Sequence, residues 1–360
     1  MRHACLFLNL FVFSCYLIQV ISGTIFLPSR LYAEEIISKK IGVIIPLSGP
    51  LAKVGEAVKN SIILADEKFD TKSSIEFIFE DDSFIPKNTI SAFSKLSNQD
   101  NVEAIYVFGS NTSLSVANIA ERSMLPMVAL GMSENISKGK DYVVRLCATT
   151  ASLSELVKTE VVNRAYKKIA ILTTQQDAML DAKENFTIDS PVSIILNEDF
   201  NPEERDFRTV ATKIADLKPD AVYILLMPPQ AAIFAKQARS LGYAGDFFGT
   251  PPLGEYEQIK VAGDAFTDAW YVTGDDKKAD SFYKLYQSKY GYQPIVEAIY
   301  AYDSAKLLIE AVYHGDINKS IHRETGFTGL LANYNFDETN TYLIPVGVHK
   351  ITKNGIKRLG

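Results

Sequence analysis

The chain of 360 residues is longer than a single hydrophobic core normally supports, so its length indicates two domains. Hydrophobic residues make up 47% of it, which is the share of a folded globular protein and excludes both a disordered chain and a polytopic membrane protein. The formal net charge of −6 argues against nucleic acid as a partner, because proteins that bind the phosphate backbone concentrate Lys and Arg on one surface.

Residues 1–33 differ in composition from the rest of the chain and predict a secretory signal peptide. Arg2 is followed by a largely apolar stretch, Leu6 to Leu27, and Leu31-Tyr32-Ala33 provides a cleavage site. The stretch is longer than an ordinary signal-peptide core, so an uncleaved membrane anchor stays open as an alternative, and lipidation at Cys15 is a third. Each form predicts a periplasmic or other extracytoplasmic protein.

Cleavage would leave Cys147 as the single cysteine of the exported chain, since Cys5 and Cys15 lie in the leader. A disulfide within one mature chain is then impossible, and stability has to come from ordinary packed cores. Cys147 lies in an apolar run, and we interpret it as a buried small hydrophobe rather than a reactive thiol.

The segment after the leader predicts a strand, a turn and a helix. Ile41 to Ile45 is an apolar run without polar alternation, which is typical of a strand covered on both faces of a parallel sheet. After the turn Pro46 to Pro50, apolar residues from Val54 to Ala65 recur with helical spacing. Such sheets bind ligands beyond the carboxyl ends of their strands, so the turn, with Ser48, is a candidate site wall.

The alternation of strands and helices continues along the chain and then restarts. In the first unit we expect strands at 75–79, 103–108, 127–130 and 142–146, with helices at 86–96 and up to residue 123. In the second unit we expect helices at 152–165, 203–217 and 230–241, with strands at 168–172, 192–196, 221–226, 246–249 and 269–272. This pattern predicts two doubly wound parallel sheets in tandem.

The last part of the chain is expected to be helical over 277–290 and 294–313, and then strand-rich over 333–336 and 343–351. A helical stretch after the second sheet indicates that the chain returns to cover the first unit. We therefore expect a first lobe of residues 36–149 plus 277–325 and a second lobe of residues 150–276 plus 326–360.

Several short segments, taken in their order and spacing, carry a resemblance to a known family. They are Ile41–Glu56, Phe79–Asp82, Ala104–Pro126, Arg145, Asp206-Phe207, Asp220–Val222, Gln237–Gly242 and Phe327–Leu330. With them the chain resembles the periplasmic solute-binding proteins of branched-chain amino acid ABC transporters, the leucine-binding-protein-like type I periplasmic binding proteins. The resemblance implies an α/β Venus flytrap, in which two doubly wound lobes are joined by a hinge of crossing segments and close over a ligand.

The resemblance also implies a ligand site in the loops after the third and fourth strands. In the family, hydroxyls and backbone N–H groups of these loops hold the α-carboxylate of an amino acid. Here the loops carry Ser110, Asn111, Thr112 and Ser113, then Gly131, Met132 and Ser133. A loop of small hydroxyl residues that opens a helix favours an anion, because it offers free N–H donors and the positive end of the helix dipole. The alternative, that these residues only cap the helix, stays open.

The second unit departs from the family pattern. Amino-acid binders of the family carry an acidic residue after the strand at 247–249, whereas this chain has Thr250-Pro251-Pro252. Where the family carries a Tyr-Gly step, this chain has Gln175-Gln176-Asp177, and where the family carries an aromatic residue before Gly55, this chain has Val54. An ammonium group would lack a partner in a closed cleft, so an ordinary branched-chain amino acid is not the expected ligand. Asp177 either substitutes as a counter-charge or caps the following helix.

Motifs for catalysis are missing from the sequence. It has no G-x-G-x-x-G, Walker A or G-x-S-x-G motif, and its histidines lack the spacing of a zinc site. The run Glu80-Asp81-Asp82 offers carboxylates that a divalent cation could bind, although acidic residues between a strand and a helix more often serve as caps or solvated charges. We expect no enzymatic activity, no cofactor and no metal.

The sequence therefore predicts a monomeric extracytoplasmic binding protein that captures a small polar or anionic solute, such as an amino-acid-like, amide or carboxylate ligand, for an ABC permease. Its candidate ligand-binding residues are Ser48, Ser110, Asn111, Thr112, Ser113, Gly131, Ser133, Gln176, Asp177 and Pro251. One alternative is a ligand-poor regulatory or protein-interaction module of the cell envelope on the same fold. A hydrolase or reductase on a doubly wound sheet is a third.

Overall fold

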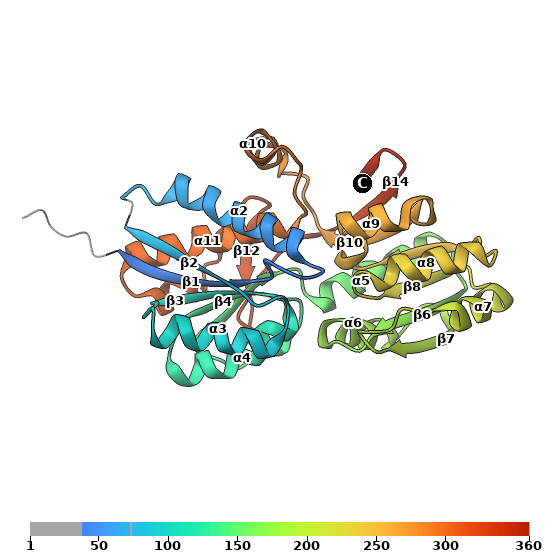
Figure 1. Cartoon of the computed structure of the whole chain (residues 1–360), viewed down its shortest axis with the longest axis horizontal. Helices are drawn as coiled ribbons and strands as arrows, with labels where there is room; N and C mark the ends of the chain where they lie inside the picture. The colour runs from blue at the N-terminus through green and yellow to red at the C-terminus, as the bar shows by residue number, and fades with distance from the viewer. Residues whose placement is uncertain (1–37, 73, 360) are drawn as a thin grey trace, which may run out of the picture. The chain divides into compact units, whose positions relative to one another are not determined.

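The computed structural model of the chain describes residues 38–72 and 74–359, and their strands form two sheets, each covered by helices (Figure 1). Ser38–Gly360 is one compact unit. The predicted signal peptide or anchor lies outside the described residues. Among the helices of the described part, none combines the length and the apolar character that a membrane crossing requires.

The first sheet has eight strands in the order β11-β12-β13-β5-β4-β3-β1-β2. Its parallel part consists of β1 (Lys39–Ile45), β2 (Ile75–Asp81), β3 (Ala104–Phe108), β4 (Met127–Leu130) and β5 (Val143–Cys147). From β1 the chain first forms β2 on one side of it and then β3 on the other side. The carboxyl ends of β1 and β3 therefore flank the switch point at which such sheets bind ligands.

Both faces of the first sheet are covered by helices. These are α2 (Ala52–Phe69), α3 (Pro86–Asn98), α4 (Ser110–Ser123), α11 (Glu297–His314) and the short α12 (Ile317–Ile321). Val43 and Ile45 pack in the core beneath α2 and α11, whereas Ile44 packs in the core beneath α3 and α4. This two-sided cover explains the unbroken apolar run of β1, because successive side chains of a strand point to opposite faces.

The second sheet repeats the strand order of the first. Its seven strands run β15-β14-β10-β9-β8-β6-β7. Its parallel part consists of β6 (Lys168–Thr174), β7 (Ser193–Phe200), β8 (Ala221–Leu225), β9 (Asp246–Gly249) and β10 (Trp270–Gly274). Its helices are α5 (Thr150–Asn163), α6 (Asp177–Thr187), α7 (Arg208–Leu217), α8 (Gln230–Ser240) and α9 (Tyr256–Ala262). The predicted tandem of doubly wound units is therefore confirmed.

The C-terminal tail divides between the two sheets, and it does so differently from the expected lobe boundaries. β11 (Phe327–Thr328), β12 (Asn333–Phe336) and β13 (Thr341–Leu343) join the first sheet, where β13 lies parallel to β5. β14 (Val346–Thr352) and β15 (Gly355–Leu359) extend the second sheet as antiparallel strands. Residues 326–360, expected as a whole in the second lobe, are thus shared. The strand-rich stretch expected over 343–351 holds the end of β13 and most of β14, and Pro345, which has no N–H for a sheet ladder, lies between them.

The chain passes between the sheets after β5, after β10 and after β13. The last two crossings lie side by side, since the Asp275 N–H donates to the Pro345 carbonyl oxygen at 2.7 Å. α10 (Asp280–Tyr290) follows the second crossing. Met132 and Met227, which follow β4 and β8, pack partly against cores of both sheets. The carboxyl ends of the two sheets therefore approach each other at these methionines.

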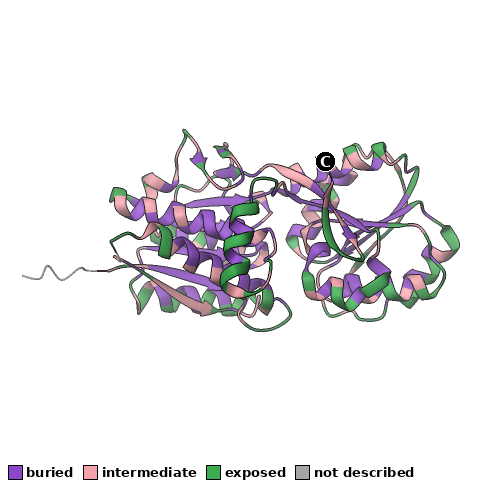
Figure 2. Cartoon of the chain, turned by 90° about the horizontal axis from the view of Figure 1, so that it is seen from above, coloured by how far each residue is buried: buried purple, intermediate pink, exposed green. Residues whose placement is uncertain are grey.

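Burial follows this arrangement, with buried residues along the sheets and exposed residues on the outer sides of the helices (Figure 2). Cys147 is a buried free cysteine, and burial raises the pKa of its thiol to about 12. The interpretation of Cys147 as a small hydrophobe of the core is therefore confirmed.

Candidate ligand-binding site

The N-terminus of α4 offers free backbone donors at the switch point of the first sheet. Gly109 precedes it at a φ of 95°, a conformation that glycine adopts without strain, and a Cβ there would collide with the ring of Phe84. Among the described residues, no side chain caps this helix. The N–H groups of its first turn, from Ser110 to Thr112, thus face outward with the positive end of the helix dipole behind them.

Two hydroxyl groups of this turn bond to the protein itself. Thr112 Oγ1 donates to the carbonyl oxygens of Phe108 and Gly109, the latter at 3.1 Å. Ser113 Oγ donates to the Val107 carbonyl oxygen at 3.4 Å, and both side chains are buried. These hydrogen bonds hold α4 at the end of β3. This is a structural role, similar to the helix capping that the sequence left open as an alternative. Asn111 is half-buried beside them.

The loop after β4 meets the start of α4, as the sequence predicts. Ser110 Oγ accepts hydrogen bonds from the N–H groups of Met132 at 2.9 Å and Ser133 at 3.4 Å. A Cβ on Gly131 would lie 2.5 Å from Ile136 Cδ1 and 3.2 Å from the Gly109 carbonyl oxygen, so the two loops pack closely because this residue is glycine. Ser110, Gly131 and Ser133 are all buried, and they therefore form one packed group that joins the two loops.

Ser133 is the unusual member of this packed group. Its side chain is fully buried, and its Oγ has no hydrogen-bond partner among the described residues. Buried hydroxyl groups nearly always have a partner, so the Ser133 hydroxyl is a donor that the described chain leaves unused. The 3-10 helix η1 (Glu134–Ile136) follows at once and fixes the loop.

Arg145 holds the same loop from beneath. Its guanidinium donates to the carbonyl oxygens of Gly131 at 3.1 Å and Met132 at 2.9 Å, to Ser137 Oγ at 3.1 Å and to Thr341 Oγ1 at 2.7 Å. It is fully buried, and no carboxylate among the described residues forms an ion pair with it. Desolvation lowers the pKa of this guanidinium, which nonetheless adds positive potential beneath the loop.

Ser48 lies in an exposed loop that Asp81 organises. Asp81 Oδ1 accepts hydrogen bonds from the N–H groups of Leu47 at 2.8 Å, Ser48 at 3.2 Å and Ser83 at 2.9 Å. The hydroxyl groups of Ser48 and Ser83 are 2.6 Å apart. Burial would raise the pKa of Asp81, but these hydrogen bonds lower it overall. Ser48 is therefore a rim residue whose hydroxyl already has a partner.

The acidic run that could have held a cation has other roles. Asp82 is buried and accepts from the Phe84 N–H and the Thr89 hydroxyl, each at 2.9 Å. Glu80 pairs with Lys95. Over residues 38–72 and 74–359, no group of His, Cys, Asp and Glu is arranged to hold a metal ion.

The candidate residues of the second sheet lie on separate loops. Gln176 is half-buried at the N-cap of α6, and Asp177 is the exposed first residue of that helix. Pro251 is half-buried and opens the 3-10 helix η2 (Pro251–Gly254). No hydrogen bond or ion pair between described residues joins these side chains to the loops of the first sheet, although α4 and α6 contact each other. Asp177 lies in the first turn of α6, where a carboxylate complements the helix dipole, and its side chain accepts no hydrogen bond from a backbone N–H group of the described residues.

The sequence did not point to a polar connection between the ends of β6 and β8. Thr174 Oγ1 bonds to Gln230 Oε1 and accepts from the Met227 N–H at 3.0 Å. Gln230 Nε2 donates to the Asn201 carbonyl oxygen at 2.8 Å. Thr174 and Gln230 are both buried. This network fixes the loops after β6 and β8 to each other.

Glu255 and Glu297 were also missed. Glu255 is buried and caps α9, accepting from the N–H groups of Glu257 at 3.0 Å and Gln258 at 2.7 Å. Glu297 is the half-buried first residue of α11. A carboxylate in the first turn of a helix is common because it complements the helix dipole, so nothing in the sequence singled out Glu297.

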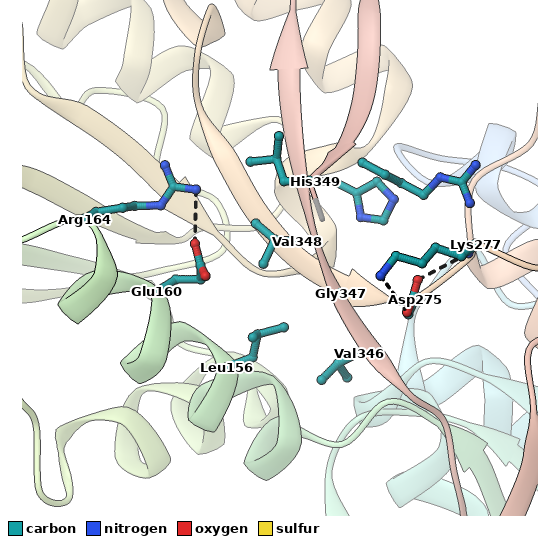
Figure 3. A pocket seen from close by; sticks show the side chains of 11 residues that line it. Leu156, Glu160, Arg164, Asp275, Lys277, Val346, Gly347, Val348 and His349 are labelled. Carbon is teal, nitrogen blue, oxygen red and sulfur yellow. Dashed lines mark hydrogen bonds and ion pairs between the residues drawn. The ribbon is translucent and has the colours of Figure 1, made fainter.

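A cavity of about 330 Å³ lies away from these residues, between α5 and β14 (Figure 3). Arg164 and Glu160 in its wall pair at 3.2 Å, and Lys277 and Asp275 pair at 3.6 Å. None of the predicted site residues lines it. Arg358 in the wall pairs with Asp276 and Asp280, which lie outside it. Because the charged groups of the wall are engaged within the protein, the strand-end loops remain the candidate site.

Two doubly wound sheets in tandem, with an uncapped helix N-terminus at a switch point, define a solute-binding protein of two lobes. A family model described as periplasmic binding protein matches residues 38–340, and the chain belongs to this family.

Known proteins with different ligands are similar to the chain. It is 25% identical over 254 residues to the Leu/Ile/Val-binding protein BraC3 of Rhizobium johnstonii, which covers 67% of this chain and 69% of that protein. Its structure resembles that of the leucine-binding protein LivK of Thermotoga maritima, with a TM-score of 0.83 and 23% identity over 89% of this chain and 98% of that one. It also resembles an ABC transporter solute-binding protein of Rhodopseudomonas palustris in complex with 3,4-dihydroxybenzoic acid, with a TM-score of 0.77 and 25% identity over 89% of this chain and 95% of that one.

These similarities confirm the predicted family and fold class, and they place the chain among substrate-binding proteins rather than enzymes. The ligands named for the relatives include aliphatic amino acids and an aromatic acid. Membership of the family therefore defines a small-molecule binder, and the choice of ligand depends on individual side chains.

Proposed function

We propose that the protein is an extracytoplasmic solute-binding protein, which captures a small polar or anionic ligand between its two lobes and delivers it to an ABC permease. The observation that carries this proposal is the uncapped N-terminus of α4 next to the orphan hydroxyl of Ser133. Both offer hydrogen-bond donors that the described chain leaves unused. A carboxylate or another small anion would accept from both.

The proposed binding geometry assigns a role to each part of the first lobe. N–H groups at the start of α4 and the hydroxyl of Ser133 donate to the anion. Ser110 ties the two loops together through the N–H groups of Met132 and Ser133. Arg145 keeps the loop after β4 in place and contributes positive potential without touching the ligand. The donors are thus fixed before the ligand arrives, which reduces the entropy lost on binding.

The second lobe would complete the site from the other side, with Gln176, Asp177 and Pro251 at its rim. We propose lobes of residues 38–147 plus 280–343 and 150–274 plus 346–359, in agreement with the two sheets. A ligand that contacts both lobes favours the closed form by the difference between its affinities for the closed and open forms. The closed monomer would then be recognised by the permease in the periplasm.

Isothermal titration of the mature protein with amino acids, amides and carboxylates tests this proposal, together with small-angle scattering before and after addition of the solute. We expect Ser133→Ala to weaken binding of a carboxylate ligand about tenfold or more, because a hydrogen bond to a charged group contributes roughly 1.5–3 kcal/mol. Ser113→Ala is the matched control, since the Ser113 hydroxyl bonds to the protein. Absence of both binding and compaction would favour the ligand-poor envelope module.

A further inference from the structure

We propose that the ring of Phe84 is an apolar shield at the N-terminus of α4, which keeps water away from the backbone donors there and so strengthens their hydrogen bonds to a bound anion. The inference rests on the proposed function, because it concerns the same N–H groups. It assigns a binding role to a residue of a different loop, the one after β2.

The Phe84 ring lies directly against the residue from which α4 begins. A Cβ on Gly109 would collide with Phe84 Cε2 and would lie 3.1 Å from Phe84 Cζ. These two atoms are neighbours in the ring, so an edge of the ring, and not its face, is turned towards Gly109. The ring of Phe108, the last residue of β3, lies beside it, with the two ring centroids 6.2 Å apart. Contacts on both sides of the junction between β3 and α4 therefore place Phe84 at the proposed site.

The backbone that carries this ring is strained. Ser83 has a φ of 52° and Phe84 has a φ of 61°, so two successive residues other than glycine adopt the left-handed region. This region is unfavourable for residues with a Cβ, and bulky residues are rarely found there. Strained residues persist where the surrounding structure fixes them, and they cluster at binding sites. The loop after β2 thus holds the Phe84 ring in a position that the backbone alone would not favour.

Two carboxylates fix the strained turn. Asp81 Oδ1 accepts a hydrogen bond from the Ser83 N–H at 2.9 Å. Asp82 Oδ1 accepts one from the Phe84 N–H at 2.9 Å. Asp82 is fully buried, and its other carboxylate oxygen accepts from the Thr89 hydroxyl of α3 at 2.9 Å. The acidic run that the sequence left open as a cation site therefore holds an aromatic side chain in place.

The ring is only half-buried, although the turn that carries it is firmly held. Phe84 packs partly against the core of the first sheet and keeps part of its surface accessible to solvent. A phenyl ring that served the core alone would gain more from complete burial. A half-buried ring beside α4 loses contact with water when a ligand arrives, so it adds apolar contact to the hydrogen bonds of the anion.

An apolar wall beside a helix N-terminus strengthens anion binding for an electrostatic reason. A charge interacts more strongly with N–H dipoles where water, with its high dielectric constant, is displaced. The same displacement protects the interaction from salt, because exposed charges are screened and buried charges are screened much less. The edge of an aromatic ring is positive and its face is negative. The edge that is turned towards Gly109 therefore does not repel an anion.

The test is titration of the mature wild-type protein and three variants with L-leucine, isocaproate, benzoate and sulfate. Phe84→Ala removes the shield, Phe84→Leu keeps an apolar side chain, and Phe77→Ala is the matched control. Phe77 lies on β2, packs against the same core and is half-buried like Phe84. Each titration is carried out at about 0.05 M and about 0.5 M sodium chloride, between which the Debye length falls about threefold.

We expect Phe84→Ala to weaken binding of a probe that the wild type binds by about tenfold or more, and to make its Kd rise more steeply with salt. Phe84→Leu and Phe77→Ala should stay within about threefold of the wild type. The inference fails, and the proposed function stands, if Phe84→Ala binds within about twofold of the wild type, if its salt dependence is unchanged, or if Phe77→Ala weakens binding equally. Failure of the wild type to bind any probe would overturn both.

Phe84→Trp provides a second measurement that does not require Phe84→Ala to fold. Trp270 is the only tryptophan of the chain and is fully buried in the second sheet, so its emission gives a constant background. The emission of Phe84→Trp should move to shorter wavelength on saturation with the bound probe, as water leaves the indole. The emission of Phe77→Trp should not change. An unchanged emission of Phe84→Trp at saturation would also overturn the inference.

Discussion

Arg145 is the residue whose replacement should affect stability and binding together. Its guanidinium makes four hydrogen bonds from three nitrogen atoms, to acceptors on three sides. In Arg145→Lys a single ammonium nitrogen has three donors, so at least one acceptor loses its partner. Because the acceptors are spread around the guanidinium, we expect two to be lost. Each unsatisfied buried acceptor costs roughly 1–3 kcal/mol, which gives a loss of about 2–6 kcal/mol in the free energy of unfolding.

Urea denaturation followed by circular dichroism measures this loss directly. The loop of Gly131 and Met132 should also shift, so titration with a bound ligand should show weaker affinity. Arg122→Lys is the matched control, because Arg122 is exposed in the last turn of α4 and should change stability by less than about 0.5 kcal/mol. If Arg145→Lys unfolds within about 0.5 kcal/mol of the wild type, the four hydrogen bonds do not hold the loop and the reasoning fails.

Two further predictions concern a close backbone contact and a buried carboxyl group in the helices that cover the first sheet. Gly55→Ala should cost roughly 3 kcal/mol or prevent folding, because its Cβ would collide with the Pro46 carbonyl oxygen, a backbone atom that cannot swing away; a melting temperature equal to the wild type would contradict this. Asp303 is buried, and its carboxyl group accepts hydrogen bonds from the Tyr334 hydroxyl at 2.6 Å and the Leu330 N–H at 2.8 Å. Burial raises the pKa of Asp303 from 3.8 to about 6. The folded state therefore holds the proton of the Asp303 carboxyl group more tightly than the unfolded state. The contribution of this group to the free energy of unfolding is greatest below about pH 4, and it falls by up to about 3 kcal/mol as the pH rises to about 6. Asp303→Asn should remove this part of the slope in denaturation curves at several pH values, and an unchanged slope would show that the Asp303 proton is not involved.

The tandem of doubly wound sheets could be predicted because its signals are local. A strand such as Ile41–Ile45 shows its burial on both faces by an unbroken apolar run, and the glycine after α8, Gly242, ends the helix where expected. The hairpin of β14 and β15 was missed although the step Asn354-Gly355 is a turn signal. Three of the five residues of β15 are exposed and two are charged, so it lacks the buried apolar run by which the other strands were found.

The partners of the tail strands could not be predicted, because strand pairing is decided by contacts far apart in the chain. Thr341 pairs in register with Arg145, and their side chains bond across 196 residues of sequence. β13 has three residues and pairs through few hydrogen bonds. Burial of Tyr334 and Tyr342 in the first core explains why the tail returns there before it crosses again.

Residue types identified the anion-binding loops, but the directions of their hydroxyl groups depend on packing. Thr112 and Ser113 look as suitable as Ser133 in the sequence, yet their hydroxyls bond to β3 while that of Ser133 has no partner. Backbone geometry decides this, since the start of α4 brings the hydroxyls of Thr112 and Ser113 to the carbonyl oxygens at the end of β3, whereas the Ser133 hydroxyl reaches no acceptor among the described residues. A sequence pattern can thus locate such a loop without showing which hydroxyl is free.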